Sequence, residues 1–363
     1  MKKFIIKNII MVIPIISVML YYLVAIEPHR NGDLGKLGFI PFDDDYDSII
    51  SHIALDSLYV IDIDDLEQIS CDSAILTIGD SFSQQGIGGY QNYIANLFPG
   101  WKIYNFKPIE GVGDQIFIDM LINGAPLPKI VIFESVEREL SQRLSGMRFD
   151  VQTKKDDKIE FLEKTTLDSD SKYIEKKELT KCLIDNKDEL RKKLLNTQEY
   201  VKKKLDIDNP VKKLKLKSSL FSCKKSENDL YFYYEDLKKV TEERYKRGRQ
   251  KLDSLLYLTE RKGICFVYLV ASDKYDLYKD FTINDTYKVN GQLDNYKKYN
   301  NDIRFLNSKA ILYPHIKRGE KDIYKCNDSH WSPIASHYIA NEIKRCIDMQ
   351  KGMQNLDSIQ PER

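Results

Sequence analysis

The chain has almost no net charge and few of the patterns that mark common classes of binding site. Its 363 residues carry 56 Lys and Arg against 55 Asp and Glu, for a formal charge of +1. This balance excludes the general electrostatic attraction that draws proteins to nucleic acid, so we expect no DNA or RNA partner. Internal repeats and low-complexity tracts are also absent. At this length the chain can bury a full catalytic core and still carry an appended segment.

Metal and nucleotide motifs are missing as well. The 6 cysteines include no C-x-x-C spacing, which argues against structural zinc. The sequence contains no H-E-x-x-H, no P-loop, no dinucleotide-binding glycine pattern and no G-x-S-x-G elbow of a standard α/β-hydrolase. None of these patterns therefore points to a metal or to a cofactor. Outside the cytoplasm the cysteines could form disulfides, but their spacing does not show which would pair, and Cys265 lies in an apolar run typical of a core.

The first thirty residues predict an export signal. Lys2, Lys3 and Lys7 precede an apolar stretch over residues 9–26, and a polar segment begins at Glu27. The stretch approaches the roughly 20 residues that span a bilayer and exceeds the roughly 7–15 of a cleavable signal. This length predicts an uncleaved anchor. Because positive charge precedes the stretch, we expect the remaining chain to be extracytoplasmic, in the periplasm or at the cell surface. A cleaved signal peptide and a buried core helix are the alternatives.

Composition divides the rest of the chain into segments. Residues 1–30 are the predicted anchor, and residues 31–72 are a linker and lead-in region without strong periodicity. Residues 141–249 are dense in Lys, Glu and Asp with apolar residues at helical spacing, which predicts a charged helical insertion or lid. The catalytic domain would then be built from both sides of this insertion, from residues 73–140 and 250–350.

The two catalytic-domain segments predict an α/β fold, a parallel sheet flanked by helices. The expected strands cover residues 74–78, 101–106, 130–133, 264–270 and 310–313, and the expected helices cover 90–97, 111–123, 245–261 and 336–347. Strands that alternate with helices in this way are typical of a parallel sheet.

The strongest local signal is Ile78-Gly79-Asp80-Ser81, where a serine follows a short apolar strand that ends in glycine. Such a turn presents the hydroxyl at the carboxyl edge of a parallel sheet, where α/β proteins place their active sites. It also leaves the backbone N–H of Ser81 free to bind a developing oxyanion. The plainer alternative is that Asp80 and Ser81 only cap a helix.

A serine nucleophile needs a base, and the chain has 5 histidines. Two of them lie within the first 52 residues, and His337 falls inside the last expected helix. His330 stands in a loop just before that helix, with Asp328 close enough in sequence to orient its ring. We therefore predict a catalytic triad of Ser81, His330 and Asp328.

These residues resemble a known family. Gly79-Asp80-Ser81 after the first core strand, with an aspartate and a histidine near the C-terminus, resembles the SGNH (GDSL-like) hydrolase superfamily. Asp328-Ser329-His330-Trp331 is similar to the D-x-H-W motif of its alginate O-acetyltransferase-like subgroup. The resemblance implies a flavodoxin-like parallel sheet and no requirement for metal.

Two further segments are similar to that subgroup. Residues 128–140 resemble its third core strand and its E-R pair, and residues 273–278 resemble another of its segments. The resemblance covers residues 73–140 and 250–347 and leaves the predicted insertion unmatched.

Two features depart from the subgroup. In the alginate-modifying proteins the D-x-H-W segment precedes the serine block, whereas here it follows, as in ordinary SGNH hydrolases. The superfamily's third block usually supplies an oxyanion asparagine, but Glu134 and Ser135 stand at the matching position. The predicted oxyanion donors are therefore Ser81 and a second-block glycine, Gly111 or Gly113. A plain strand-to-helix turn is the alternative for the glycines.

Two more residues are predicted to contact substrate. Arg138 could bind a carboxylate or phosphate group, or it could pair with Glu134 or Glu137 near the end of its strand. Trp331 lies beside His330 in sequence and would help to shape a water-poor pocket.

The resemblance implies a membrane-anchored O-acyltransferase, in particular an O-acetyltransferase that modifies a cell-envelope or exported polysaccharide through an acyl-enzyme. A glycan is then the acceptor, and a membrane-bound O-acyltransferase is the expected supplier of the acyl group. A carbohydrate acetylesterase would use the same triad with water as acceptor. A catalytically silent polysaccharide-binding or assembly protein that keeps the SGNH fold is the alternative from another class.

Overall fold

A computed structural model describes residues 32–38, 40, 43, 46–66, 69, 73–107, 113–149, 209–284 and 287–357. Nearly all of them fall in one compact unit, Asn31–Val151 with Pro210–Arg363. The predicted anchor over residues 1–30 lies outside the described residues. Among the helices that are described, none is long and apolar enough to cross a membrane.

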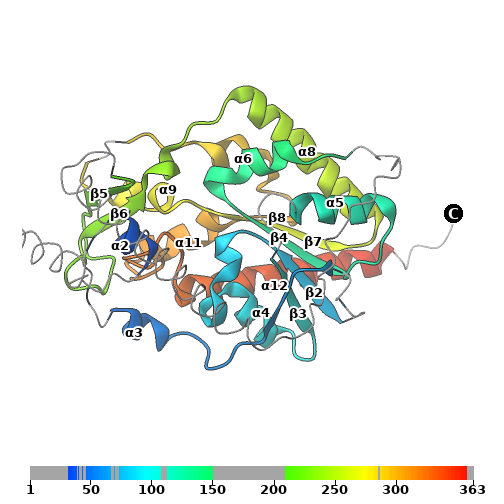
Figure 1. The fold of residues 1–363 in the computed structure, drawn as a ribbon, viewed down its shortest axis with the longest axis horizontal. Coiled ribbons are helices and arrows are strands. Elements are labelled where there is room, and N and C mark those ends of the chain that lie inside the picture. Colours follow the sequence, from blue (N-terminus) through cyan, green and yellow to red (C-terminus); the bar gives the residue numbers. More distant parts are fainter. Residues whose placement is uncertain are drawn as a thin grey trace, which may run out of the picture. The chain divides into compact units, whose positions relative to one another are not determined.

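Within the described residues, six strands form one parallel sheet (Figure 1). In spatial order they are β1 (Val60–Ile63), β3 (Lys102–Phe106), β2 (Ala74–Ile78), β4 (Ile130–Val136), β7 (Cys265–Ala271) and β8 (Phe305–Asn307). Counted from β2, the last five follow the order 2-1-3-4-5, a common order for doubly wound sheets. The winding reverses between β2 and β4, and a crevice forms at the carboxyl ends of strands at such a point.

The central strands are buried on both faces. Every position of β4 and β7 is buried, as expected for strands covered by helices on each side. Successive side chains alternate between the faces, so Ile130 and Ile132 pack into one core while Val131 and Phe133 pack into the other.

Helices cover both faces of the sheet and give three layers (Figure 1). One layer holds α4 (Tyr90–Leu97), α11 (Ser308–Lys317) and α12 (Pro333–Asp357). The other holds α5 (Gly113–Asn123), α6 (Glu137–Gly146) and α8 (Glu242–Arg261). The predicted α/β class with a helix-flanked parallel sheet is therefore confirmed.

Smaller elements surround the sheet. They are α2 (Asp33–Gly38), α3 (Tyr46–Ser51), α9 (Lys274–Tyr278) and α10 (Gln292–Asn295), with the 3-10 helices η2 (Ser81–Gln84), η3 (Gly86–Gly88), η4 (Tyr234–Leu237), η5 (Lys279–Phe281) and η6 (Lys297–Tyr299). A separate antiparallel hairpin joins β5 (Val211–Lys215) to β6 (Asp229–Tyr233).

Local sequence explains where the longest helices begin. The Ser332 hydroxyl accepts a hydrogen bond from the Ile334 N–H at 3.1 Å, and Pro333 occupies the first helical position of α12, where its missing N–H costs nothing. In α8 the Thr241 hydroxyl accepts from the Arg244 N–H at 3.4 Å. The start of α12 matters for the site because it follows directly after His330 and Trp331.

The structure corrects one expected strand. Residues 310–313 belong to helix α11, because Asn307 caps that helix through the Lys309 N–H, and Leu312 and Ile316 bury one helical face. The strand at this place is the shorter β8, which precedes the helix.

Two predicted boundaries also differ from the structure. The lead-in region supplies β1 at the edge of the sheet, which the weak pattern of residues 31–72 did not indicate. The ends of the predicted insertion, residues 141–149 and 210–249, lie in the same compact unit as the sheet and include the hairpin of β5 and β6. Residues 150–208 lie outside the described residues.

Four of the cysteines are described, and all four are buried free thiols: Cys223, Cys265, Cys326 and Cys346. Cys265 lies in the core of the sheet as expected. Cys71 and Cys182 lie outside the described residues.

Candidate active site

Ser81 lies at the carboxyl edge of the sheet, where the winding reverses. It begins η2 after β2, and its side chain is exposed to solvent. The end of the neighbouring strand β4 is fixed to this turn, because the Val136 N–H donates to Asp80 Oδ2 at 2.7 Å. Ser81 therefore lies at the carboxyl edge of the parallel sheet, the position expected from the sequence.

A buried carboxyl group supports the turn that carries the serine. Glu134 Oε2 accepts hydrogen bonds from the Asp80 N–H at 3.0 Å and from the Ser83 hydroxyl at 2.9 Å. Burial, followed by the charge of Asp80, raises the pKa of Glu134 well above its usual value and so favours the neutral acid. A Cβ at Gly79 would lie 2.1 Å from Ser83 Oγ and 2.4 Å from Glu134 Oε2, so glycine is required there.

The three predicted catalytic side chains form one hydrogen-bonded chain. His330 Nε2 lies 2.7 Å from Ser81 Oγ, and His330 Nδ1 lies 2.5 Å from Asp328 Oδ1. The ring of Phe82 packs against the imidazole with its centroid 4.7 Å away. The fold thus brings together Ser81 and His330, which are 249 residues apart in the sequence.

The charge state of Asp328 suits this arrangement. Burial would raise the pKa of Asp328, but the hydrogen bond and charge of His330 outweigh it and hold the pKa well below its usual value. A carboxylate at Nδ1 favours the tautomer in which Nδ1 carries the proton. Nε2 is then free to accept the proton of the Ser81 hydroxyl.

No family model, curated protein or solved structure matches the chain. The chemistry of the site is therefore inferred from its own geometry.

The loop that carries Asp328 and His330, residues 325–330 (the catalytic loop below), is closed like a hairpin. The Lys325 N–H donates to the carbonyl of His330 at 3.2 Å, and Tyr324 forms an antiparallel bridge with Trp331. The two ends of the loop are therefore adjacent, and the second end leads directly into α12.

A buried lysine, Lys274, also binds the catalytic loop. Lys274 follows β7, and its Nζ donates to the carbonyls of Lys325 at 2.6 Å, Cys326 at 3.2 Å and Asp328 at 2.9 Å. Burial lowers the pKa of Lys274 to about 8. The ammonium group thus acts as a fixed cation that gathers three carbonyls of the catalytic loop.

A second carboxylate lies beside the triad. Asp33 Oδ1 accepts the Ser329 N–H at 2.6 Å, and Asp33 Oδ2 accepts the Ser329 hydroxyl and lies 3.7 Å from His330 Nδ1. One atom each from Asp33, Asp328 and His330 lie within 4.8 Å of one another, a spacing at which three side chains could share a cation. Those atoms already bind one another or Ser329, so a cation would have to displace these hydrogen bonds.

The oxyanion donors are placed only in part. Among the described residues, nothing accepts a hydrogen bond from the Ser81 N–H, which leaves it available as a donor. Gly113 begins α5, and the next residue, Asp114, forms a two-pronged ion pair with Arg143 at 2.7 and 2.9 Å. Arg143 Nη1 also lies 3.5 Å from Asp80 Oδ2. Arg143 therefore links the start of α5 to the turn that carries Ser81. Gly111 lies outside the described residues.

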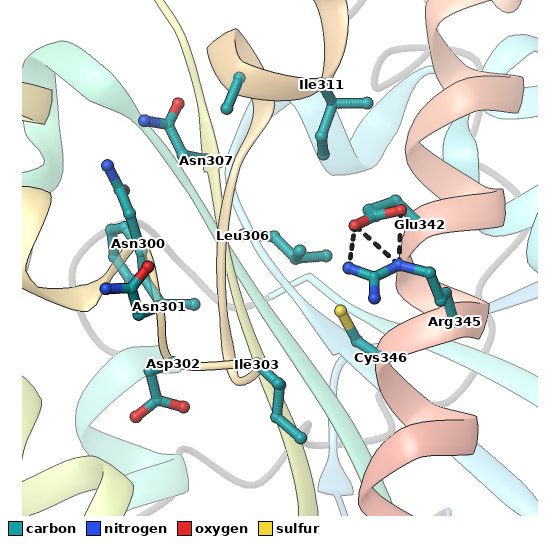
Figure 2. Close-up of a pocket in the computed structure, with 12 residues that line it drawn as sticks. Asn300, Asn301, Asp302, Ile303, Leu306, Asn307, Ile311, Glu342, Arg345 and Cys346 are labelled. Carbon is teal, nitrogen blue, oxygen red and sulfur yellow. Dashed lines mark hydrogen bonds and ion pairs between the residues drawn. The ribbon is translucent and has the colours of Figure 1, made fainter.

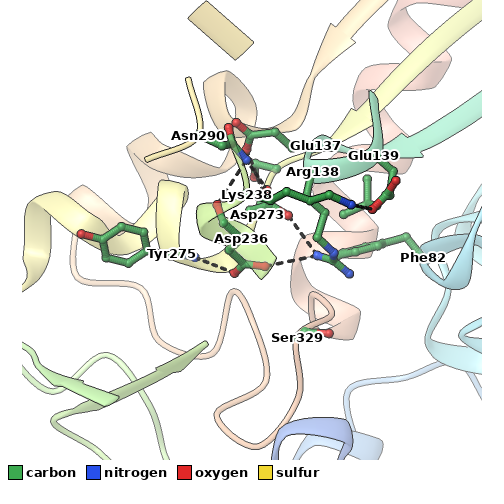
Figure 3. Close-up of polar contacts among 12 residues, drawn as sticks. Phe82, Glu137, Arg138, Glu139, Asp236, Lys238, Asp273, Tyr275, Asn290 and Ser329 are labelled. Atoms are coloured by element: carbon green, nitrogen blue, oxygen red, sulfur yellow. Dashed lines mark hydrogen bonds and ion pairs between the residues drawn. The ribbon is translucent and has the colours of Figure 1, made fainter. Parts of the chain in front are cut away.

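Arg138 belongs to an internal ion-pair network (Figure 3). Its Nη1 donates to Asp273 at 2.9 Å and to Asp236 at 3.3 Å, and both carboxyl groups are fully buried. Of the two roles expected for Arg138, the structure shows pairing with acidic side chains. The partners are these two aspartates and not Glu134 or Glu137. Burial raises the pKa of Asp236 to about 6 against the opposing effect of Arg138. The charge of the guanidinium is balanced within the protein, which weakens the case for an anionic ligand here.

Trp331 supports the site from inside the core. Its side chain is fully buried and packs edge-on against Phe82, with ring centroids 4.8 Å apart. With the Gln85 amide oriented to fit, its oxygen accepts from the indole N–H at 3.1 Å. The predicted contact with substrate does not fit this placement, because the indole leaves no face exposed.

A cavity of about 290 Å³ lies away from the triad, between β8, α11 and α12 (Figure 2). Asn300, Asn301 and Asn307 line one side, and the ion pair of Glu342 with Arg345 lines the other. None of the predicted site residues lines it.

Sequence reasoning missed four residues that shape the site: Asp33, Glu134, Arg143 and Lys274. Glu134 lies in the carboxyl half of β4 and Lys274 follows β7, and a charged residue at such a position is a usable signal. Asp33 and Arg143 stand in polar segments without any pattern that would single them out.

Proposed function

We propose that the protein is a serine acyl-transfer enzyme of the SGNH type. The observation that carries this proposal is the continuous series of hydrogen bonds from Ser81 through His330 to Asp328 at the carboxyl edge of the sheet. The flavodoxin-like strand order supports the resemblance, since SGNH proteins share it. A nucleophile, a base and an orienting carboxylate in this geometry are typical of acyl transfer.

The geometry supplies each step of such a reaction. Ser81 Oγ attacks the acyl carbonyl while His330 Nε2 takes its proton, and Asp328 stabilises the imidazolium that forms. The Ser81 N–H, for which no acceptor is found among the described residues, is the proposed donor to the developing oxyanion. His330 then protonates the leaving group, and in the second half it deprotonates the acceptor that attacks the acyl-serine.

We further propose that the acceptor is a hydroxyl of a cell-envelope or exported glycan, so that the protein is an O-acyltransferase whose chemistry needs neither a metal nor a cofactor. The D-x-H-W motif at Asp328 supports this choice, as does the predicted anchor at residues 9–26, which would hold the site outside the cytoplasm. A membrane-bound O-acyltransferase would then supply the acyl group. An acetylesterase is the second candidate, because the exposed Ser81 is open to water as an acceptor.

The test uses the full chain in detergent with an activated acetyl ester, in water alone and with neutral oligosaccharides. We expect acetyl transfer to sugar, lost in Ser81→Ala. Hydrolysis without transfer would favour the esterase. Equal activity in the wild type and in Ser81→Ala would contradict both, and glycan binding without turnover would favour a silent binding protein.

A further inference from the structure

Two carboxylates, not one, converge on the catalytic histidine. Asp328 Oδ1 lies 2.5 Å from His330 Nδ1, and Asp33 Oδ2 lies 3.7 Å from the same nitrogen. The Asp33 N–H also donates to Asp328 Oδ2 at 3.4 Å, so the two groups are held side by side. The second carboxylate comes from a residue 297 positions earlier in the chain than His330, counted from the printed numbering.

Asp33 is bound to the catalytic loop by more than this approach. Its two oxygens accept the backbone N–H and the hydroxyl of Ser329, the residue between Asp328 and His330. Since Ser329 is buried, these hydrogen bonds fix the backbone that joins the two catalytic side chains. Replacing Asp33 would therefore disturb the positions of both Asp328 and His330.

The segment that carries Asp33 is itself fixed against the loop. The Gly35 N–H donates to the carbonyl of Asn327 at 3.2 Å, and Asp47 accepts from the Asn327 amide at 3.0 Å. A Cβ at Gly32 would lie 2.2 Å from the Asn327 oxygen, which shows how closely the two backbones approach. The position of Asp33 is thus determined by several independent contacts.

The placement has a chemical consequence in acyl transfer. The imidazole of His330 becomes positively charged each time it holds the serine or acceptor proton. A second negative group near Nδ1 adds to the stabilisation of that cation, because the side chains of His330 and Asp328 are only 17% and 16% exposed. Burial, followed by the charge of Asp328, raises the pKa of Asp33, as expected for two carboxylates that share one partner.

We propose that Asp33 is a positioning residue that holds the catalytic loop through Ser329 and acts as a reserve hydrogen-bond acceptor for His330 Nδ1. This inference rests on the proposed function for its catalytic meaning. When Asp328 is removed, the ring needs only a small shift to reach Asp33. Loss of both carboxylates should then cost far more than the separate losses predict.

The first test is a double-mutant cycle on ester hydrolysis by the full chain. We expect kcat/KM to fall about tenfold in Asp33→Ala, about 10²-fold in Asp328→Ala and about 10⁴-fold in the double variant, the loss typical of a disabled triad. Asp47→Ala is the matched control, because Asp47 contacts the same loop without approaching His330. Combined with Asp328→Ala it should give the product of the single effects.

A double variant no worse than the product of its singles would overturn the inference. An equal excess in the Asp47 cycle would overturn it too, since general loosening of the loop would then explain the result. Melting temperatures of all variants identify any that fail to fold.

The second test does not depend on activity, so it separates this inference from the proposed function. In the full chain with nitrogen-15 histidine, the 5 histidines give few enough signals to follow the hydrogen-bonded Nδ1 proton of His330, identified with His330→Ala. We expect this low-field signal in the wild type, retention in Asp328→Ala and loss in the double variant. Loss already in Asp328→Ala would show that Asp33 does not act as a reserve acceptor.

Discussion

The turn that carries Ser81 has no room for a side chain at Gly79. An added Cβ would meet Ser83 Oγ at 2.1 Å and Glu134 Oε2 at 2.4 Å, and both atoms support the turn. We expect Gly79→Ala to lower ester hydrolysis at least tenfold and to destabilise the fold by about 1–3 kcal/mol, the usual cost of overpacking. Initial rates and urea unfolding measure the two effects.

Gly146→Ala is the control for this change. Gly146 ends α6, and a Cβ there would meet nothing within 4 Å. The control should keep full activity and gain up to about 1 kcal/mol, as glycine-to-alanine changes in helices do. Equal losses in both variants would contradict the role assigned to Gly79.

Glu134 makes a second prediction at the residue scale. Because its raised pKa favours the neutral acid, a glutamine should replace it with little loss, since the amide oxygen can accept the same two hydrogen bonds. We expect Glu134→Gln to keep activity within a few-fold. Glu134→Ala should leave the Asp80 N–H and the Ser83 hydroxyl without this acceptor and lose about 2–4 kcal/mol of stability. Activity in Glu134→Gln as low as in the alanine variant would show that the charged form is needed.

At the scale of elements, Lys274 connects β7 to the catalytic loop. Lys274→Met removes three hydrogen bonds to carbonyls of the catalytic loop. We therefore expect this variant to lose at least tenfold in the rate of ester hydrolysis. Lys298→Met is the control, because Lys298 forms an exposed ion pair with Asp253 on another element.

The lysine also predicts a dependence of stability on pH. Its pKa in the folded protein, about 8, lies below the value of 10.5 expected for the unfolded chain, so the unfolded state binds the proton more tightly. Protonation of this group favours the unfolded state, so the free energy of unfolding rises as the pH increases from about 8 to 10.5. The free energy of unfolding of the wild type, relative to Lys274→Met, should rise by about 2 kcal/mol between pH 8 and pH 10. A constant difference across this range would contradict the lowered pKa.

Several elements could be predicted from the sequence because they combine a local pattern with a clear boundary. β2 is a run of five buried residues that ends at Gly79, and α12 has Ser332 and Pro333 at its start. β1 was not recognised, because it lies at the sheet edge and is half exposed, with Ile61 at 43%. The apolar run at residues 310–313 predicts a strand but belongs to α11, because four residues are too few to distinguish a strand from one turn of a buried helix.

The candidate site divides in the same way. Ser81, Asp328 and His330 could be predicted because each stands in a short motif at the end of a strand or before a helix. Asp33 and Lys274 act through contacts between segments far apart in sequence, and a single charged residue carries no periodicity that reveals such a contact. The pairing of Arg138 with Asp236 and Asp273 likewise depends on how the chain folds back.

At the scale of the whole molecule, the described unit contains both cores of the sheet and the three residues of the proposed triad. Residues 150–208 lie outside the described residues. We expect a chain in which these residues are replaced by a flexible linker of about 20 glycines and serines to keep its melting temperature within a few degrees and its hydrolysis of a small ester within about threefold. Unfolding of this variant would show that the sheet unit depends on the replaced segment.

The most direct measurement traps the acyl-enzyme. The full chain is mixed with an activated acetyl ester, stopped in acid within seconds and digested, and the acetylated peptide is identified by mass spectrometry. We expect one acetyl group on Ser81, absent in Ser81→Ala and formed about 10³- to 10⁴-fold more slowly in His330→Ala. Acetylation that avoids Ser81, or that proceeds equally fast without His330, would contradict a serine acyl-transfer mechanism at this site.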